Sequence, residues 1–192
     1  MATRRVLSKA KKITLNVWTD SEGVLTPPSA ETTALDLDAI VADSTTFTQE
    51  DPTTDTIDCE TSDSPIVEVV TSGKFTIEMT SADVSDDILE KALGYEKVGT
   101  DAVAAPASYV KKYATVEIAF QDGKFVLPKV QLTSKIDGSS LKTSVVKGTI
   151  SGTCYDTFVK VGDNEVKTAF LFMKKADAAL GTGFTISETA TE

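Results

Sequence analysis

The chain of 192 residues contains no histidine, only two cysteines and a single tryptophan. Without histidine, a Ser-His-Asp triad and histidine-based acid–base catalysis are excluded. The two cysteines, Cys59 and Cys154, do not have the spacing of a metal site. Both lie in alternating apolar runs, which predicts buried free thiols.

Long apolar segments are also missing. The N-terminus is positively charged but lacks the apolar stretch of ~7–15 residues that an export signal needs. Nothing in the sequence approaches the ~18 consecutive apolar residues of a membrane span. We therefore expect a protein that is made in the cytoplasm, is not exported by the usual signal and has no membrane partner.

Positive charge is absent over a long stretch, since no Lys or Arg occurs from Ile13 to Gly73 while acidic residues accumulate there. The first twelve residues, in contrast, carry only basic charges: Arg4, Arg5, Lys9, Lys11 and Lys12. The net charge of −10 disfavours a protein that grips nucleic-acid phosphates.

These two charged segments have two interpretations. Charge runs are typical of a solvated face or a flexible arm. Alternatively, the basic segment of one copy meets the acidic segment of the next and steers head-to-tail assembly. For this second interpretation the candidate acidic residues are Asp51, Asp55 and Asp58.

The length suits a single domain, 1–192, with appended segments. We expect a basic arm over 1–12, a long acidic loop between subunits over about 20–56, and a flexible tail over 185–192. Residues 20–56 show no clear hydrophobic period, and a structureless stretch of this length is uncommon inside a compact domain. Such a stretch is either disordered alone or ordered against neighbouring chains.

Threonine and serine alternate with Val, Ile and Phe through much of the chain, a pattern typical of β-strands. Ile13–Val17 predicts a strand, residues 66–79 a hairpin that turns at 71–73, and Asp122-Gly123 a second hairpin. Pro128 predicts an edge strand or a bulge. The glycines Gly148 and Gly152 suggest close backbone approach or bending in another strand.

One short amphipathic α-helix is predicted at about 83–93. Its apolar stripe consists of Val84, Ile88, Leu89, Ala92 and Leu93, and Gly94 is a natural stop. Because so short a helix is marginal alone, it must dock on a sheet. The expected fold is therefore mainly β: an antiparallel β-sandwich or half-barrel flanked by this one helix.

No pattern of residues indicates catalysis, a cofactor or a metal, so we expect no enzymatic role. The segments DPTTD and SADVSDD could suggest calcium, but neither has the spacing or central glycine of a loop that wraps the ion. An Asp-Pro turn and a helix N-terminus explain them more simply. Trp18 is interpreted as a packing residue at a strand end.

The segments TQEDPTTDTIDCETSDSPI, VEVVTSGKFTIEM and SADVSDDILEKALG resemble, in that order, a pattern found in phage major tail tube proteins. The later hairpin ending KFVLPKVQLT and the glycine-interrupted strand KGTISGTCYD are similar to the second half of that family. The likeness covers roughly residues 46–95 and 113–156. The insertion at 98–108 and the basic N-terminal arm have no counterpart in the pattern.

This resemblance implies a structural protein that assembles with itself. Six subunits would join edge to edge into a ring, and rings would stack into a hollow tube for genome delivery in a virion tail. The implied partners are further copies of the chain, other tail proteins at the tube ends, and genomic DNA that passes through the lumen without specific binding. A negative lumen would repel the DNA backbone.

Two alternatives stay open. The chain could form a related ring, in a tail baseplate or as the inner tube of a contractile injection apparatus. It could instead be a monomeric Thr-rich β-sandwich that binds a target, as an adhesin does. The second alternative predicts an export signal, and none is found at the N-terminus.

Overall fold

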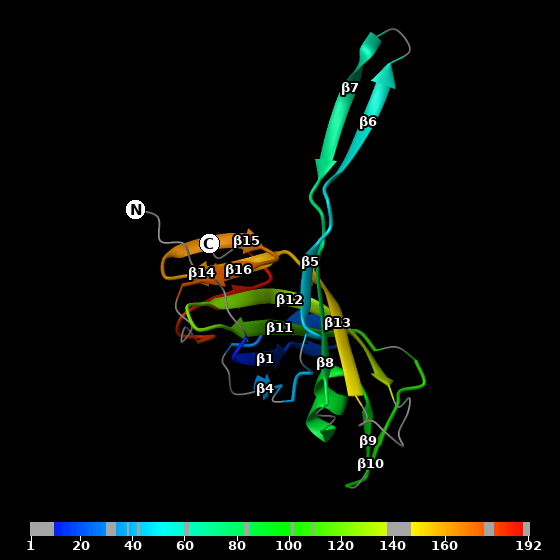
Figure 1. Cartoon of the computed structure of the whole chain (residues 1–192), viewed down its shortest axis with the longest axis vertical. Helices are drawn as coiled ribbons and strands as arrows, with labels where there is room; N and C mark the ends of the chain where they lie inside the picture. The colour runs from blue at the N-terminus through cyan, green and yellow to red at the C-terminus, as the bar shows by residue number, and fades with distance from the viewer. Residues whose placement is uncertain are drawn as a thin grey trace.

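The computed structural model describes residues 10–29, 34–37, 39–41, 43–59, 62–82, 85–100, 102–108, 110–137, 147–174 and 179–189; for 56–59, 62–68, 134 and 137 it describes the backbone alone. The body is built on one eight-stranded antiparallel sheet in the order β4-β1-β11-β12-β13-β8-β5, with β16 also paired to β12 (Figure 1). Its strands are β1 (Lys12–Val17), β4 (Ala34–Asp36), β5 (Thr46–Gln49), β8 (Phe75–Ser81), β11 (Lys112–Ala119), β12 (Lys124–Asp137), β13 (Lys147–Tyr155) and β16 (Leu171–Met173). The sheet is open, with β4 and β5 at its two ends.

The other strands form one three-stranded sheet and three separate pairs. The three-stranded sheet has the order β15-β14-β17. It consists of β14 (Thr157–Val161), β15 (Asn164–Thr168) and β17 (Thr185–Ser187). The pairs are β2 (Thr19–Ser21) with β3 (Val24–Thr26), β6 (Thr53–Cys59) with β7 (Ser62–Thr71), and β9 (Glu96–Val98) with β10 (Ala102–Ala104).

Both faces of the central sheet are covered. On one face, buried apolar side chains of β1, β8, β11, β12 and β13 pack with Ile88, Ala92 and Leu93 of the helical segment. On the opposite face, Trp18 and Val126 pack with residues of β14, β16, β17 and the segment before β17. The predicted mainly β, antiparallel fold flanked by one short helix is confirmed, and the two packed sheets give it the layering of a sandwich.

Several local predictions are confirmed. Trp18 is 4% exposed, and its Nε1–H donates to Thr115 Oγ1 at 3.1 Å and to the Pro128 carbonyl at 3.3 Å. Pro128 lies in a β-bulge, since the β11–β12 register shifts between Ala114 and Val116. Cys154 is a buried free thiol, and burial raises its pKa to about 12.

The helix differs from the predicted α-helix over 83–93. Residues 83–84 lie outside the described part of the chain, and the segment Ile88–Ala92 (η2) is a π-helix. Its wider turn is seen where the Leu93 N–H donates to the Ile88 carbonyl, five residues earlier, at 3.1 Å. The extra residue per turn lets Ile88, Ala92 and Leu93 all face the core. Gly94 follows with φ +73°, which fits its predicted role as the helix stop.

The boundaries of three predicted segments need correction. Residues 20–56 are not one structureless loop, because β4, β5 and the β2–β3 pair lie within or across this range. These strands have only three or four residues, and their partners are often distant, as in Phe47 opposite Ile77. Local periodicity therefore could not reveal them.

The two chain ends are also more ordered than predicted. In the N-terminal segment, Lys12 already belongs to β1, and the Lys11 N–H donates to the Ala119 carbonyl at 2.7 Å. In the C-terminal tail, 185–187 form β17, which pairs with β14 and buries Ile186. The segment 98–108, expected to be a surface insertion, includes strand β10.

Glycine in β13 provides a test of close packing. A Cβ on Gly152 would lie 2.4 Å from Val130 Cγ1 and 2.8 Å from the Gln131 carbonyl oxygen, whereas a Cβ on Gly148 would meet nothing within 4 Å. We expect Gly152→Ala to lower the free energy of unfolding by about 1–3 kcal/mol through overpacking. The matched Gly148→Ala should leave it within about 1 kcal/mol. Urea unfolding of both variants checks this, and equal effects would contradict the proposed crowding.

Candidate self-assembly interface

Residues 46–81 form one long β-ribbon that leaves the sheet and projects from the body (Figure 1). At its base β5 pairs with β8, and farther out β6 pairs with β7 as far as Cys59 and Ser62. The Glu50 N–H donates to the Lys74 carbonyl at 2.9 Å and links the two ladders. We call residues 50–74 the acidic arm.

The arm corrects the predicted hairpin over 66–79. The chain does not turn back at 71–73, because β7 pairs with β6 while β8 pairs with β5 and β13. Gly73 serves another purpose: a Cβ there would lie only 1.7 Å from the Glu50 carbonyl oxygen. Glycine is needed here because the two strands of the ribbon approach closely at this position. In the sequence, the same glycine is easily interpreted as part of a turn.

The arm is acidic and exposed. Seven acidic residues and no Lys or Arg lie between positions 50 and 73. Residues 50–55 are all exposed, and Val69 and Val70, on opposite faces of β7, are 51% and 62% exposed. Within the described chain, β6 and β7 pair only with each other. The arm therefore offers charge, two valines and two strand edges to a partner.

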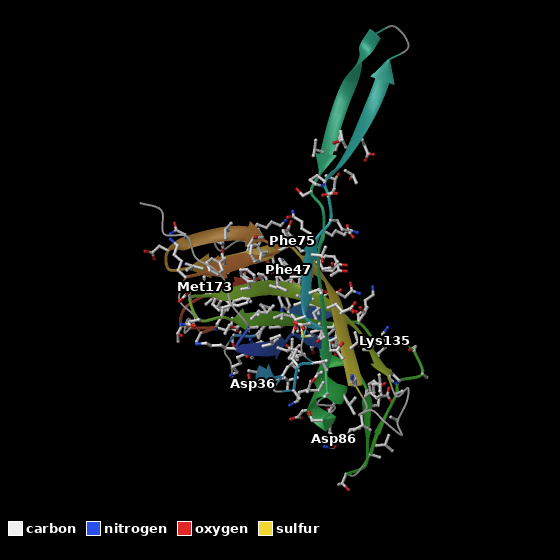
Figure 2. All side chains as sticks on the ribbon, viewed as in Figure 1. Asp36, Phe47, Phe75, Asp86, Lys135 and Met173 are labelled. Atoms are coloured by element: carbon white, nitrogen blue, oxygen red, sulfur yellow. The ribbon has the colours of Figure 1, made fainter. Side chains whose placement is uncertain are left out.

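Phenylalanine side chains hold the root of the arm. Phe47 on β5 and Phe75 on β8 are stacked, with ring centroids 5.4 Å apart, and Figure 2 shows them at the base of the ribbon. Phe170 packs on both rings, at 5.4 Å from Phe47 and 5.8 Å from Phe75. Phe125 extends the cluster at 5.1 Å from Phe170. Aromatic pairs of this kind add about 0.5–1.5 kcal/mol each beyond burial, so the cluster stabilises the β5–β8 pairing from which the arm starts.

The structure does not bring the predicted acidic and basic site residues together within one chain. Asp51 and Asp55 are exposed on the acidic arm, and Asp58 lies in β6 with its side chain outside the described part. Lys11 and Lys12 lie at the start of β1 in the body. Arg4, Arg5 and Lys9 lie outside the described residues.

Lys12 has a partner in its own chain. Its Nζ lies 2.8 Å from Asp36 Oδ2, and the Thr14 hydroxyl donates to Asp36 Oδ1 at 2.9 Å. Burial acts to raise the pKa of Asp36, but the bonds from Lys12 and Thr14 and the charge of Lys12 outweigh it, so this pKa is lowered. The pair therefore contributes stability above the ordinary carboxyl pKa and loses it as pH falls through the lowered pKa. Both side chains are about half exposed, so this contribution is small.

A second polar cluster, which the sequence analysis missed, is buried between the two sheets. Lys124 Nζ lies 2.6 Å from Glu117 Oε2, and the Asn16 amide donates to Glu117 Oε1 at 2.6 Å. All three side chains are at least nine-tenths buried. Glu117 lies between apolar Val116 and Ile118 in β11, and only the pairing of β11 with β1 and β12 brings its partners close. The arrangement is a buried ion pair with one amide donor, and Asn16 Oδ1 is buried without a hydrogen-bond partner among the described residues.

An apolar groove lies at the three-stranded sheet, on another part of the body from the acidic arm. Its volume is about 780 Å³, and its walls come from the β14–β15 hairpin, β16 and residues 179–183. Val166 on one wall is 47% exposed, and Met173 on β16 is labelled in Figure 2. Among the described residues, Lys174 is the only charged one that lines it. Sequence analysis did not predict the groove, because it is formed by the packing of several short segments and not by a local pattern.

A scan against protein-family models and a search of curated proteins found no match to this chain. In the part of the chain that the structure describes, no helix is long and apolar enough to cross a membrane. The same residues contain no group of three or more His, Cys, Asp or Glu that could hold a metal ion.

The buried ion pair gives a stability test. We expect Lys124→Met to lower the free energy of unfolding by about 3–5 kcal/mol, because Glu117 is left buried without its counter-charge. The double variant Glu117→Gln/Lys124→Met should recover most of this loss. Lys12→Met, which removes the exposed pair with Asp36, should cost less than about 1 kcal/mol. Urea unfolding at neutral pH measures all three, and a Lys124→Met effect as small as that of Lys12→Met would be inconsistent with this account.

Proposed function

We propose that this protein is a self-assembling structural subunit of a virion tail, whose copies form rings that stack into a hollow tube for genome delivery. The observation that carries the proposal is the acidic arm, a long ribbon that projects from a well-packed body. Supporting it are the mainly β fold and the resemblance of residues 46–95 and 113–156 to tail tube proteins.

The arm makes little physical sense in an isolated monomer. A two-stranded hairpin without further packing is marginally stable in water. Unpaired strand edges also invite pairing with other chains, and proteins usually cover or shorten them. Here β7 extends over ten residues, about 30 Å of strand, beyond the body. A contact with a neighbouring subunit would supply the missing burial.

The charge distribution suits a conduit. With a net charge of −10, a tube built from this chain would carry excess negative charge and would repel the DNA backbone, so the genome could pass without sticking. The subunit would be made in the host cytoplasm and would function in the virion tail. Its partners would be other copies of itself and the tail proteins at the tube ends, with no cofactor.

Two other functions use the same features differently. A baseplate ring, or the inner tube of a contractile injection apparatus, would assemble through the same arm. A monomeric binding module would instead use the arm to grip a foreign target, and would show no tendency to self-associate.

Removing the acidic arm tests the proposal. Because Gln49 and Phe75 are paired, residues 50–74 can be replaced by Asn-Gly, which closes β5 and β8 as a short hairpin. Negative-stain microscopy of the full chain at high concentration should show rings or tubes of uniform width. The shortened chain should keep its thermal unfolding midpoint but stay monomeric. A full chain that never assembles, even with added salt or nucleating tail proteins, would contradict the proposal.

Reversing charge tests electrostatic docking between copies. We expect Asp51→Lys/Asp55→Lys/Asp58→Lys, or removal of residues 1–9, to raise the concentration needed for assembly by about tenfold, as the loss of complementary charge costs about 1–2 kcal/mol. The circular-dichroism spectrum should not change. Reversal of two exposed acids on the body, Glu96 and Asp156, is the control. Normal assembly of both the charge-reversed chain and the chain without residues 1–9 would rule out electrostatic steering between copies.

A further inference from the structure

The apolar groove has the features of a docking surface. Val161 and Val166 from the β14–β15 hairpin line it together with Leu171 and Phe172. Val166 is 47% exposed although its neighbour across the ladder, Val159, is fully buried. An exposed valine beside a concave apolar wall indicates a docking surface, because covering this apolar area with a partner is energetically favourable.

A strand edge runs along the same groove. In the described chain β15 pairs with β14 alone, so its outer edge is open, and β16 pairs with β12 alone. An added strand could therefore form backbone hydrogen bonds with β15 while its side chains enter the groove. Recognition of this kind combines ladder bonds for affinity with pockets for alternate side chains.

The acidic arm matches this surface in three respects. Strand β7 has an open edge of its own, and it places an exposed valine on each face, Val69 and Val70. Positions 50–73 of the arm carry seven acidic residues and no Lys or Arg, and the single cation of the arm, Lys74, lies at its root. Among the described residues, Lys174 is the only charged one that lines the groove. The groove thus offers an apolar floor and a positive rim to an acidic ribbon with apolar side chains.

A chain's own arm does not serve as this partner. The arm leaves the body at the β5–β8 edge and points away from it, so that its far end lies distant from β14, β15 and β16 (Figure 1). The phenylalanine cluster packs the root of the arm onto the body at this edge. The occupant must therefore come from another copy.

We propose that the groove between β15 and β16 receives the acidic arm of a second copy, with β7 added along the open edge of β15. This inference rests on the proposed self-assembly and names the surface that receives the arm. Since arm and groove are different surfaces, each copy uses both, and the contact repeats from copy to copy into a ring or a filament.

Directed disulfide formation tests the contact. In a Cys59→Ser background, copies with Val69→Cys or Val70→Cys are mixed with copies carrying Val166→Cys under assembling conditions and mild oxidation. Buried Cys154 stays in place. We expect a disulfide-linked dimer from one of the two mixtures. Copies carrying Val24→Cys, a 65% exposed valine of the β2–β3 pair, are the matched control and should give no dimer above background.

Substitution provides an independent measurement. Val166→Asp should raise the concentration needed for assembly at least about tenfold, because docking would bury an unpaired carboxylate. Val24→Asp should leave it unchanged, and circular dichroism establishes that both variants fold. If Val166→Asp does not fold, the disulfide experiment decides alone.

The outcomes separate this inference from the proposed function. Assembly without the Val166 cross-link, or with equal cross-linking at Val24, would overturn the arm-in-groove contact and leave the tube proposal standing. A chain that carries Val166→Cys together with Val69→Cys or Val70→Cys gives a further check: a cross-link formed within that chain at high dilution would show that the groove receives its own arm and would likewise overturn the inference. If the full chain never assembles and no dimer forms, both proposals fail.

Discussion

The central strands β1, β11 and β12 are buried on both faces, and the rest of the structure follows from this constraint. One face must be covered by the helical segment and the other by the three-stranded sheet. Polar side chains on these strands therefore need internal partners. The Asn16–Glu117–Lys124 cluster and the bonds of Trp18 to Thr115 and Pro128 supply them.

Once both faces of the sheet are used, the remaining strand edges are the places where the chain can meet a partner by backbone pairing. At one end of the sheet, β5 and β8 continue into the acidic arm instead of stopping. On the second sheet, β15 leaves an edge open beside the apolar groove. The phenylalanine cluster connects these regions, because Phe170 follows β15 in the chain and packs on the root of the arm. The root of the arm thus packs against the segment that joins β15 to β16, the two strands that border the groove.

The sequence predicted what depends on local pattern. The alternation of apolar and polar residues predicted the antiparallel β class, the strand at Ile13–Val17 and the buried thiol of Cys154. Pro128 indicated an edge strand or a bulge, and it lies in a bulge. Proline and glycine signals are local because they act on one backbone position.

What the sequence could not predict depends on which strands meet. Gly73 was interpreted as a turn, but its close contact is with Glu50, and only the pairing of distant strands reveals it. Glu117 looks like a solvated residue until β1 and β12 bring Asn16 and Lys124 beside it. The groove was not predicted either, because it forms only when the β14–β15 hairpin, β16 and residues 179–183 pack together.

The composition of the acidic arm explains how a long open ribbon can exist without uncontrolled aggregation. Two arms that met edge to edge would bring together two sets of acidic residues from positions 50–73, which contain no Lys or Arg, and their mutual repulsion would disfavour the pair. A groove with an apolar floor and a lysine at its rim carries no such penalty. The acidic residues therefore disfavour pairing of one arm with another arm, but do not disfavour pairing of an arm with a groove. A chain that joins only unlike surfaces grows in one direction, which is the geometry that a ring or a tube requires.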